Sequence, residues 1–299
     1  MKCRILNLFL ILLAVYLPIS STHADDTKSA AIFTKVLPFA ELANAIYEEK
    51  NLLVNIAQQH ELKLNDVDNI AGVEVSYALL TDVLKKQHVV VIRGTANVEN
   101  AIADMDIKLL KDAQSGVLLH QGFLSASTPI LQKLEKSLDK EFDILITGHS
   151  LGGAVAVILA MQLDNNDFKV NKVITFGQPK VTNIEGANRY KHLNVTRLVR
   201  PKDLVPIVPP VDPMDLKNMD IYWHLGKELI LLDSNEYAEL EGLKSMLRGG
   251  DFLTIAPSEE NLESHKMTGY LALIKNNSLK TEKVEYKSSF NPLSLFGGN

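Results

Sequence analysis

Short continuous apolar runs alternate along this chain with segments in which apolar residues recur at spacings of three and four. A continuous run predicts a buried strand, and the three-and-four spacing predicts a helix. Strands are predicted at residues 73–80, 88–92, 142–147, 172–176, 194–199 and 229–232. Helices are predicted at residues 39–47, 128–138 and 153–161. This alternation predicts an α/β fold, with a mainly parallel central sheet and helices on both faces.

Two later segments lack a clear period. Residues 233–263 are polar, charged and irregular, which predicts an insertion, with a turn at 248–250. Residues 278–299 also show little periodicity and are predicted to form a partly disordered C-terminal tail. Upstream, Ser125 or Ser127 is expected to cap the helix at 128–138.

The first residues have the pattern of a secretory signal peptide. Lys2 and Arg4 precede the apolar stretch 5–19, and Thr22-His23-Ala24 is a plausible cleavage site. The apolar stretch is short for a membrane span and contains Pro18, although an uncleaved anchor is the alternative. We therefore expect a signal peptide over residues 1–24, a globular domain over 25–277 and the tail over 278–299. The expected location is secreted or periplasmic.

Composition narrows the classes of partner. The single cysteine, Cys3, would leave with the signal peptide, and an exported chain without disulfides favours a bacterial origin. Without Lys2 and Arg4 the 31 basic residues fall to 29 against 36 acidic ones, a formal net charge of −7. This charge argues against nucleic acid as a partner and against strong capture by anionic membranes. No further stretch suggests a membrane span. No metal-binding motif occurs, and no cofactor is expected.

The segment Gly148-His149-Ser150-Leu151-Gly152 fits the pattern G-x-S-x-G between a predicted strand and a predicted helix. In that context the serine sits on a sharp turn with its hydroxyl exposed, which predicts Ser150 as a nucleophile. The chain is expected to pack so tightly here that a side chain at Gly148 or Gly152 would clash. The N-terminus of the following helix would direct its free amides at the reaction centre.

A serine nucleophile needs a histidine base, and the histidine needs a carboxylate to fix its tautomer. With this turn the chain order is serine, acid, histidine. Asp203 follows the strand 194–199 and is the favoured acid. Its rivals lie on a proline-rich loop and are Asp212, Asp215 and Asp220. Of the two histidines after Asp203, the later one, His265, is the favoured base, and His224 is expected to be structural.

An oxyanion formed at Ser150 needs preorganised N–H donors. The amide of Leu151 is one candidate. The second donor should come from the loop after the strand 88–92, where Thr95 offers an amide and a hydroxyl and Gly94 permits close approach. A plain strand-ending turn is the alternative for this loop. His149 is expected to pack away from the serine hydroxyl, and His120 to be structural.

These blocks, together with others, occur in the order seen in one known family. The chain resembles the class 3 (fungal-type) triacylglycerol lipases, a branch of the α/β-hydrolases, over roughly residues 31–275. The matching blocks are residues 91–95 with Asn100 and Asp104, 120–123, 146–154, 175–181, 203–206, 222–228, and 265–267 with Tyr270. The resemblance implies an α/β-hydrolase fold over residues 25–277 and a serine esterase that acts on lipid esters.

In such lipases a short helical lid follows the oxyanion loop. The matching segment, residues 97–110, has few large apolar residues, and Ala101 stands where many relatives carry tryptophan. This departure weakens an expectation of interfacial activation. The predicted insertion 233–263 lies between acid and base and is a second candidate to cover the pocket.

The function expected is therefore exported hydrolysis of a lipid ester, with a membrane or emulsion surface as one setting for the substrate. The resemblance gives Ser150, Asp203 and His265 the roles of nucleophile, acid and base, with Thr95 and Leu151 as the oxyanion hole. Phospholipase A1, short-chain esterase, feruloyl esterase and acyltransferase activities stay open, since they differ in pocket shape and water access. A catalytically inert, exported lipid-binding or adhesion protein on the same fold is the alternative of a different class. Nothing in the sequence indicates the oligomeric state.

Overall fold

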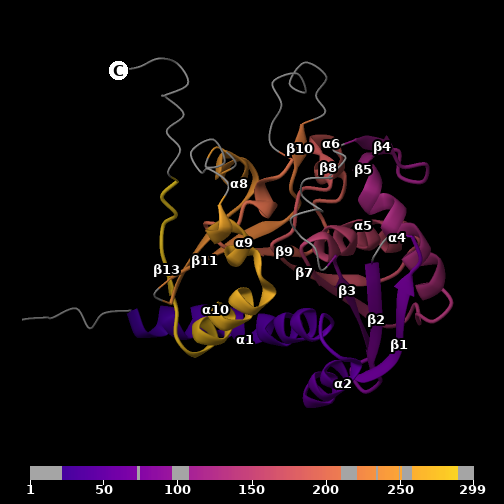
Figure 1. Cartoon of the computed structure of the whole chain (residues 1–299), viewed down its shortest axis with the longest axis horizontal. Coiled ribbons are helices and arrows are strands. Elements are labelled where there is room, and N and C mark those ends of the chain that lie inside the picture. Colours follow the sequence, from indigo (N-terminus) through magenta and orange to yellow (C-terminus); the bar gives the residue numbers. More distant parts are fainter. Residues whose placement is uncertain are drawn as a thin grey trace, which may run out of the picture.

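A long sheet runs through the molecule (Figure 1). The computed structural model describes residues 22–72, 75–95, 108–209, 221–233, 235–248, 250 and 258–288. Within these residues the sheet has nine strands, which in spatial order are β1 (Lys63–Ile70), β2 (Val75–Asp82), β3 (Gln87–Arg93), β6 (Asp143–His149), β7 (Val170–Phe176), β9 (Val195–Val199), β11 (Lys227–Leu232), β12 (Glu236–Leu240) and β13 (Glu282–Lys283).

The centre of the sheet is parallel. Strands β3, β6, β7, β9 and β11 pair in parallel, whereas β1 and β2 add an antiparallel edge and β12 pairs antiparallel with β11. The expected α/β architecture with a mainly parallel sheet is confirmed. A parallel strand order places the carboxyl ends of β3, β6, β7 and β9 at one edge, where side chains from distant parts of the chain can meet.

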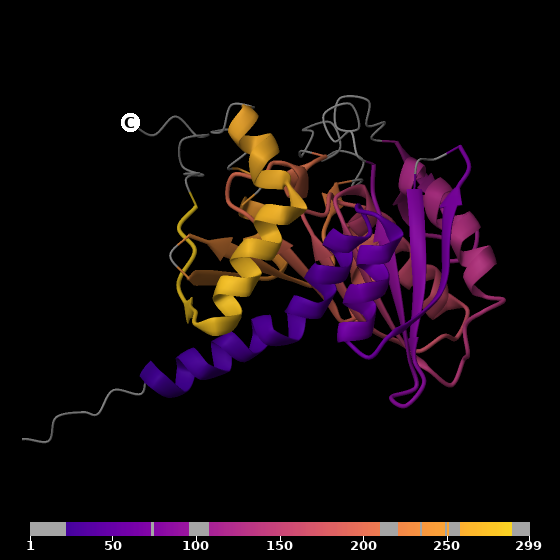
Figure 2. The same ribbon diagram turned by 60° about the horizontal axis from the view of Figure 1, so that its bottom comes forward.

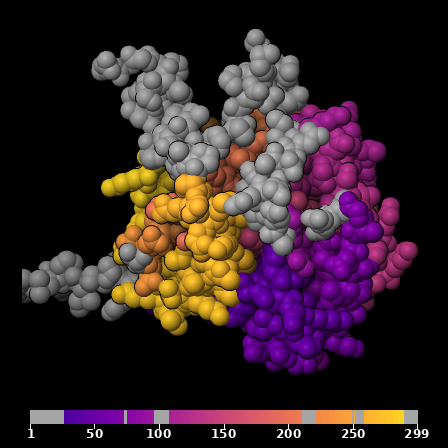
Figure 3. All heavy atoms as spheres, viewed as in Figure 1, coloured from indigo at the N-terminus to yellow at the C-terminus, as the bar shows by residue number. Residues whose placement is uncertain are grey.

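Helices cover both faces of this sheet. On one face lie α1 (Thr22–Ala45), α2 (Lys50–Gln59) and α10 (Met267–Leu279), and on the other lie α4 (Gln121–Leu134) and α5 (Leu151–Asn165). Successive residues of β6 alternate between the two cores, with Ile144 and Ile146 beside α5 and Leu145 on the side of α1 and α2. Figures 2 and 3 show α1 and α10 side by side on the first face.

The helix after the predicted serine turn is the most deeply placed. Every residue of α5 from Gly152 to Leu163 is buried. A helix that is apolar all round has to be enclosed, and this one is enclosed by the sheet and by α4. The turn at its start is therefore held on a rigid element.

A second, smaller sheet accompanies the first. It joins β10 (Tyr222–Trp223), β8 (Thr182–Asn183), β5 (Leu118–His120) and β4 (Leu109–Lys111) in that order. The short helix α6 (Ile184–Arg189) follows β8 and is capped by the Asn183 side chain, which accepts from the amide of Gly186 at 3.0 Å.

The segment 233–263 shows no periodic pattern in its sequence, yet its described part folds into regular elements. It contains β12, α8 (Gly242–Leu247) and most of α9 (Glu259–His265). The predicted tail likewise supplies β13, which pairs in parallel with β12. Both strands are too short for a periodic signal. β12 pairs with the backbone edge of β11, and β13 pairs in turn with β12. Residues 289–299 of the tail lie outside the described residues.

The start of α4 also differs from the prediction. The helix begins at Gln121, and its N-cap is His120, whose side chain accepts from the amide of Phe123. Neither expected serine caps it: Ser127 lies inside the helix, where its hydroxyl donates to the carbonyl of Leu124. Ser125, Ser127 and the internal Pro129 weaken the helical pattern, but burial of Phe123 and Leu124 against the core overrides propensity.

The N-terminal helix is longer than predicted. α1 runs from Thr22 through the expected cleavage site to Ala45, whereas the sequence pattern indicates a helix only at 39–47. Residues 1–21 of the predicted signal peptide lie outside the described residues, so that segment stays a prediction. No described helix has the length and apolar content that crossing a bilayer requires.

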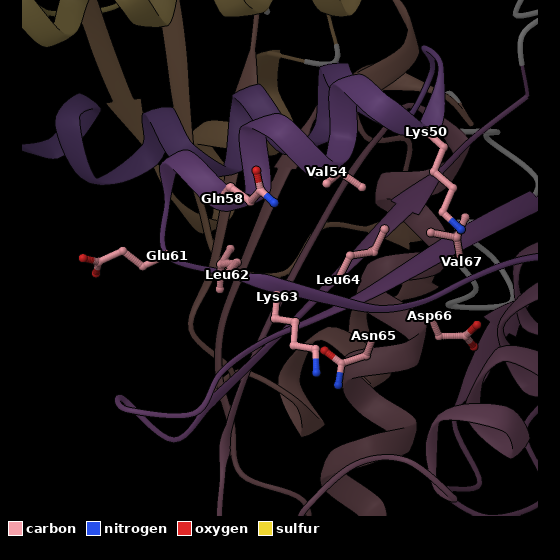
Figure 4. A pocket seen from close by; sticks show the side chains of 10 residues that line it. All are labelled: Lys50, Val54, Gln58, Glu61, Leu62, Lys63, Leu64, Asn65, Asp66 and Val67. Atoms are coloured by element: carbon pink, nitrogen blue, oxygen red, sulfur yellow. The ribbon is translucent and has the colours of Figure 1, made fainter.

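α2 and β1 lie in a stretch for which the sequence pattern gives no prediction. They border an open groove of about 640 Å³, with Lys50, Val54 and Gln58 on α2 facing Leu64 and Val67 on β1 (Figure 4). The groove is lined by residues 50–67 and contains none of the predicted site residues.

A buried ionic cluster attaches α8 to the sheet. Glu228 on β11 pairs with Arg248 at 2.5 Å and with Arg197 on β9 at 3.7 Å, and Ser245 donates to it. Glu228 and Arg248 expose only 1 % and 2 % of their side chains. Arg248, the first residue of the predicted turn at 248–250, is therefore buried.

We expect Glu228→Gln to lower the free energy of unfolding by about 3–5 kcal/mol, since it leaves two buried guanidinium groups without their counter-charge. The matched control is Glu239→Gln on the neighbouring strand, which loses a half-exposed pair with Lys283 and should cost less than about 1 kcal/mol. Urea unfolding measures both. Equal losses in the two variants would contradict the importance of the buried cluster.

Candidate active site

Ser150 occupies a strained turn between β6 and α5. Its backbone has φ 59° and ψ −132°, a region that residues with a side chain rarely adopt. The expected clash at the flanking glycines is confirmed. A Cβ on Gly148 would overlap the carbonyl of Gly152, and a Cβ on Gly152 would lie 2.7 Å from the amide nitrogen of Gly94. The turn is possible only because three backbones approach here without side chains.

Three predicted residues meet at this turn. The Nε2 atom of His265 lies 2.8 Å from the Ser150 hydroxyl, and its Nδ1 atom lies 2.8 Å from an oxygen of Asp203. The side chains are enclosed, with exposures of 4 % for Ser150, 2 % for His265 and 0 % for Asp203. A carboxylate only accepts hydrogen bonds, so Nδ1 carries the ring proton and Nε2 accepts from the serine.

The alternatives for these positions lie elsewhere. His224 is buried with its Nε2 atom 2.6 Å from the carbonyl of Pro206, which agrees with its expected structural role. The rival acids Asp212, Asp215 and Asp220 lie outside the described residues. Asp203 follows β9, as expected from the strand pattern, and His265 is the last residue of α9.

The helix α9 is attached to the loop that carries Asp203. Ser258 and Asn261 form a capping box at its start. The Asn261 side chain also donates to the carbonyl of Lys202 at 2.8 Å, and Arg200 donates to the carbonyl of Ser264 at 3.0 Å. These two bonds hold His265 opposite Asp203.

The carboxylate of Asp203 is buried, and hydrogen-bond donors of the protein take the place of water around it. The Tyr270 hydroxyl donates to one oxygen at 2.6 Å, and the amide of Val205 donates to the other at 2.9 Å. Burial, with the adjacent carboxylate, raises the pKa of Tyr270 well above its ordinary value, so this phenol remains a donor. Gly177 (φ 56°) leaves the room for this pair, since a Cβ there would lie 2.9 Å from Asp203 and from His265.

The predicted oxyanion donors flank the turn. Leu151 is the first residue of α5, where helix amides have no partner within the helix. Thr95 follows Gly94 in the sequence and is buried. A Cβ on Gly94 would lie 2.8 Å from the amide nitrogen of Gly152. The loop after β3 therefore packs on the serine turn. The lid segment predicted at 97–110 lies outside the described residues up to 107.

One buried cation in this region had no signal of its own in the sequence. The ammonium of Lys180 donates to the carbonyls of Ile207 and Pro209 at 2.7 and 2.8 Å. These carbonyls belong to the loop that begins at Asp203 and contains the short helix η1 (Val205–Ile207). Lysine is usually a surface residue, so only the position of Lys180 within the matching block 175–181 pointed to it.

Burial sets the charge of this loop's donors. Desolvation, with smaller contributions from Arg248 and Arg197, lowers the pKa of Lys180 to about 7. Desolvation also lowers the pKa of His224 well below its ordinary value, so this ring is neutral and donates through Nε2. Among the described residues, no group of three or more histidine, cysteine or acidic side chains could hold a metal ion.

Comparison with known proteins identifies the relationship. Residues 89–212 match the family model described as Lipase (class 3). Over these residues the chain is similar to the class 3 lipases. The match to this family includes Thr95, Ser150, Leu151 and Asp203, whereas His265 lies beyond it.

Two curated relatives and one solved structure define the extent of the likeness. The secreted mono- and diacylglycerol lipase 1 of Fusarium solani is 33% identical over 140 residues, which cover 44% of this chain and 42% of the relative. A lipase of Rhizomucor miehei is 29% identical over 147 residues, covering 45% and 40%. The crystal structure of the lipase from Rhizopus microsporus var. chinensis matches with a TM-score of 0.57 and 24% identity, covering 68% of this chain and 75% of that one.

The expected α/β-hydrolase fold is confirmed by this structural likeness. The chain spans about two fifths of the length of the curated relatives that it matches.

Lys180 should give the protein a distinctive pH dependence. Its folded pKa of about 7 lies below the unfolded value, so the unfolded chain binds more protons above pH 7 and stability rises with pH. Relative to Lys180→Met, the wild-type free energy of unfolding should rise by roughly 2 kcal/mol between pH 7.5 and 9.5. Urea unfolding at the two pH values measures this difference. Lys169→Met, which removes an exposed lysine, should keep the wild-type slope; parallel curves for wild type and Lys180→Met would contradict the prediction.

Proposed function

We propose that the chain is a serine carboxylic-ester hydrolase that acts on lipid esters through an acyl-enzyme at Ser150. The observation that carries this proposal is the buried sequence of hydrogen bonds from Ser150 to His265 to Asp203, at 2.8 Å each. A serine, a base within reach of it and an acid that orients the base are the parts that acyl transfer requires.

The proposed reaction follows from this arrangement. The Ser150 oxygen attacks the ester carbonyl carbon while Nε2 of His265 takes the hydroxyl proton. Amides of Leu151 and Thr95 receive the oxyanion, and the intermediate collapses as His265 returns the proton to the leaving alcohol. A water molecule, deprotonated by His265, then attacks the acyl-serine, and His265 returns that proton to the Ser150 oxygen as the carboxylic acid leaves. Asp203 holds the imidazole in the required tautomer and stabilises its cationic form.

The substrate class rests on the relatives. Their names describe mono- and diacylglycerol lipases and lipases, so we propose a glycerolipid ester as the substrate. The relative from Fusarium solani is named as secreted, which together with the predicted signal peptide at residues 1–24 supports an exported protein. An inert binding protein is the weaker alternative, because a decayed site would have lost one of the three hydrogen-bonded side chains.

Ser150→Ala should abolish both reaction with a fluorophosphonate probe and ester hydrolysis. Asp203→Asn should lower kcat about 10⁴-fold, since an amide no longer selects the correct imidazole tautomer. The matched controls are Ser127→Ala, a buried serine within α4, and Asp164→Asn, which pairs with His192 at the surface. Both should retain wild-type rates. Labelling or hydrolysis that persists in Ser150→Ala would refute the proposed nucleophile.

The substrate class is tested with an ester panel on the purified wild-type protein. The panel contains short- and long-chain p-nitrophenyl esters, a diacylglycerol, a triacylglycerol emulsion and a phosphatidylcholine. We expect the highest kcat/KM on an acylglycerol. A preference for phosphatidylcholine would indicate a phospholipase A1, and activity confined to short p-nitrophenyl esters would indicate a simple esterase; either result would overturn the acylglycerol assignment while leaving the serine mechanism intact.

A further inference from the structure

A second hydrogen-bonded chain lies beside Ser150 and involves residues outside the proposed mechanism. The Tyr47 hydroxyl lies 3.1 Å from Nδ1 of His149, and Nε2 of His149 lies 2.7 Å from the carbonyl oxygen of His265. At the other end, the amide of Gly94 donates to the Tyr47 hydroxyl at 3.2 Å. The chain thus joins the loop that carries Thr95 to the residue that carries the base.

The two backbone groups at the ends of this series of hydrogen bonds determine which atoms donate and which accept. A backbone N–H can only donate and a backbone carbonyl can only accept. The Tyr47 oxygen therefore accepts from Gly94, and Nε2–H of His149 donates to the carbonyl of His265. The Tyr47 hydroxyl proton has two acceptors within reach, Nδ1 of His149 at 3.1 Å and the carbonyl of His149 at 3.5 Å, and the shorter contact is the one to Nδ1. Only a neutral His149 with its proton on Nε2 completes this order.

The surroundings favour that state of both side chains. Burial, with a contribution from the nearby His265, lowers the pKa of His149 well below its ordinary value. Burial raises the pKa of Tyr47 to about 12. The guanidinium of Arg93 lies over the Tyr47 ring, 5.5 Å from its centre. The ring of His149 lies 4.6 Å from that of His265.

Both attached groups need an anchor. His265 is the last residue of α9, and the terminal carbonyls of a helix have no partner within it. Gly94 follows the last residue of β3, and the next residue is the predicted oxyanion donor Thr95. A shift of about 1 Å in a group that positions the reacting atoms costs on the order of 100-fold in rate.

We propose that Tyr47 and His149 are positioning residues: they fix the positions of the base, His265, and of the oxyanion loop relative to Ser150. The proposal rests on the proposed serine-hydrolase function. It assigns a role to His149 beyond packing, and to a tyrosine directly after α1 that the sequence did not single out.

The first test removes one hydroxyl. Tyr47→Phe should lower kcat and the rate constant of fluorophosphonate labelling by 10- to 100-fold, with KM changed less than 2-fold. The matched control is Tyr77→Phe, which removes the hydroxyl of another buried tyrosine, bonded at 2.8 Å to Asp66 on the far edge of the sheet. It should leave both rates within 2-fold of wild type. Equal effects in the two variants would overturn the positioning role.

The second test replaces the imidazole. His149→Gln keeps an N–H donor near the position of Nε2 and should recover part of the rate that His149→Leu loses. Because the residues act as one chain, Tyr47→Phe should add little to His149→Leu. Full additivity of the two losses, or equal rates in His149→Gln and His149→Leu, would overturn the proposal.

A third measurement does not depend on activity. In ¹⁵N spectra of the wild-type imidazoles, assigned by His149→Gln, His149 should keep the neutral Nε2–H form from pH 5 to 8, and Tyr47→Phe should shift its Nδ1 resonance. A His149 that protonates in this range, or carries its proton on Nδ1, would overturn the hydrogen-bonded chain. A wild-type protein that neither hydrolyses the panel nor reacts with the probe would instead refute the proposed function, and with it the positioning role, even with the chain intact.

Discussion

The site depends on the close approach of three glycine backbones at the end of β6. Gly94, Gly148 and Gly152 meet where a single Cβ would overlap neighbouring backbone atoms. This contact lets β6 turn sharply into α5 and brings the end of β3 against the same turn. The positive φ of Ser150 is a strain of about 1–3 kcal/mol. The buried α5 and the parallel strands on either side of β6 keep the turn from relaxing.

The turn at Ser150 is also bonded to the end of the neighbouring strand, β7. The amide of Ser150 donates to the carbonyl of Phe176 at the end of β7, at 2.9 Å. The following residue, Gly177, turns with positive φ and leaves space for Asp203 and His265. The serine, acid and base thus come together over consecutive strand ends, although their positions in the chain are widely separated.

The parts of the site that the sequence predicts are those encoded locally or by chain order. The strand–turn–helix around Ser150 is visible in the consecutive residues 142–161, and the order serine, acid, histidine points to Asp203 and His265. The structure brings these three residues into contact, and their catalytic roles stay a proposal. The five parallel strands are also predicted, because buried parallel strands are long apolar runs.

What the sequence does not reveal depends on contacts between distant segments. Tyr47 ends the segment 39–47 that the sequence pattern predicts as an amphipathic helix, and nothing nearby marks its hydroxyl as a partner of His149. Lys180 and Arg248 look like surface cations, and only their enclosure beside loop carbonyls and Glu228 gives them another role. β12 forms because it pairs with the edge of β11 that β9 leaves free. The five residues of β12 are too short a pattern to predict this pairing.

Three sets of hydrogen bonds fix His265, and each set restricts a different motion of this residue. Asp203 fixes the tilt of the imidazole through Nδ1, and Tyr270 with Val205 in turn fixes the carboxylate. The bonds from Arg200 and Asn261 fix the axis of α9, on which His265 is the last residue. The carbonyl of His265 lies at the junction of α9 and α10, where these bonds do not fix its orientation. The hydrogen bond from Nε2 of His149 fixes it. Since His149 is also the neighbour of Ser150, the nucleophile and the backbone of its base are tied to the same point of the sheet. These bonds support the 2.8 Å separation of Ser150 and His265, which lies within the range that proton transfer between them requires.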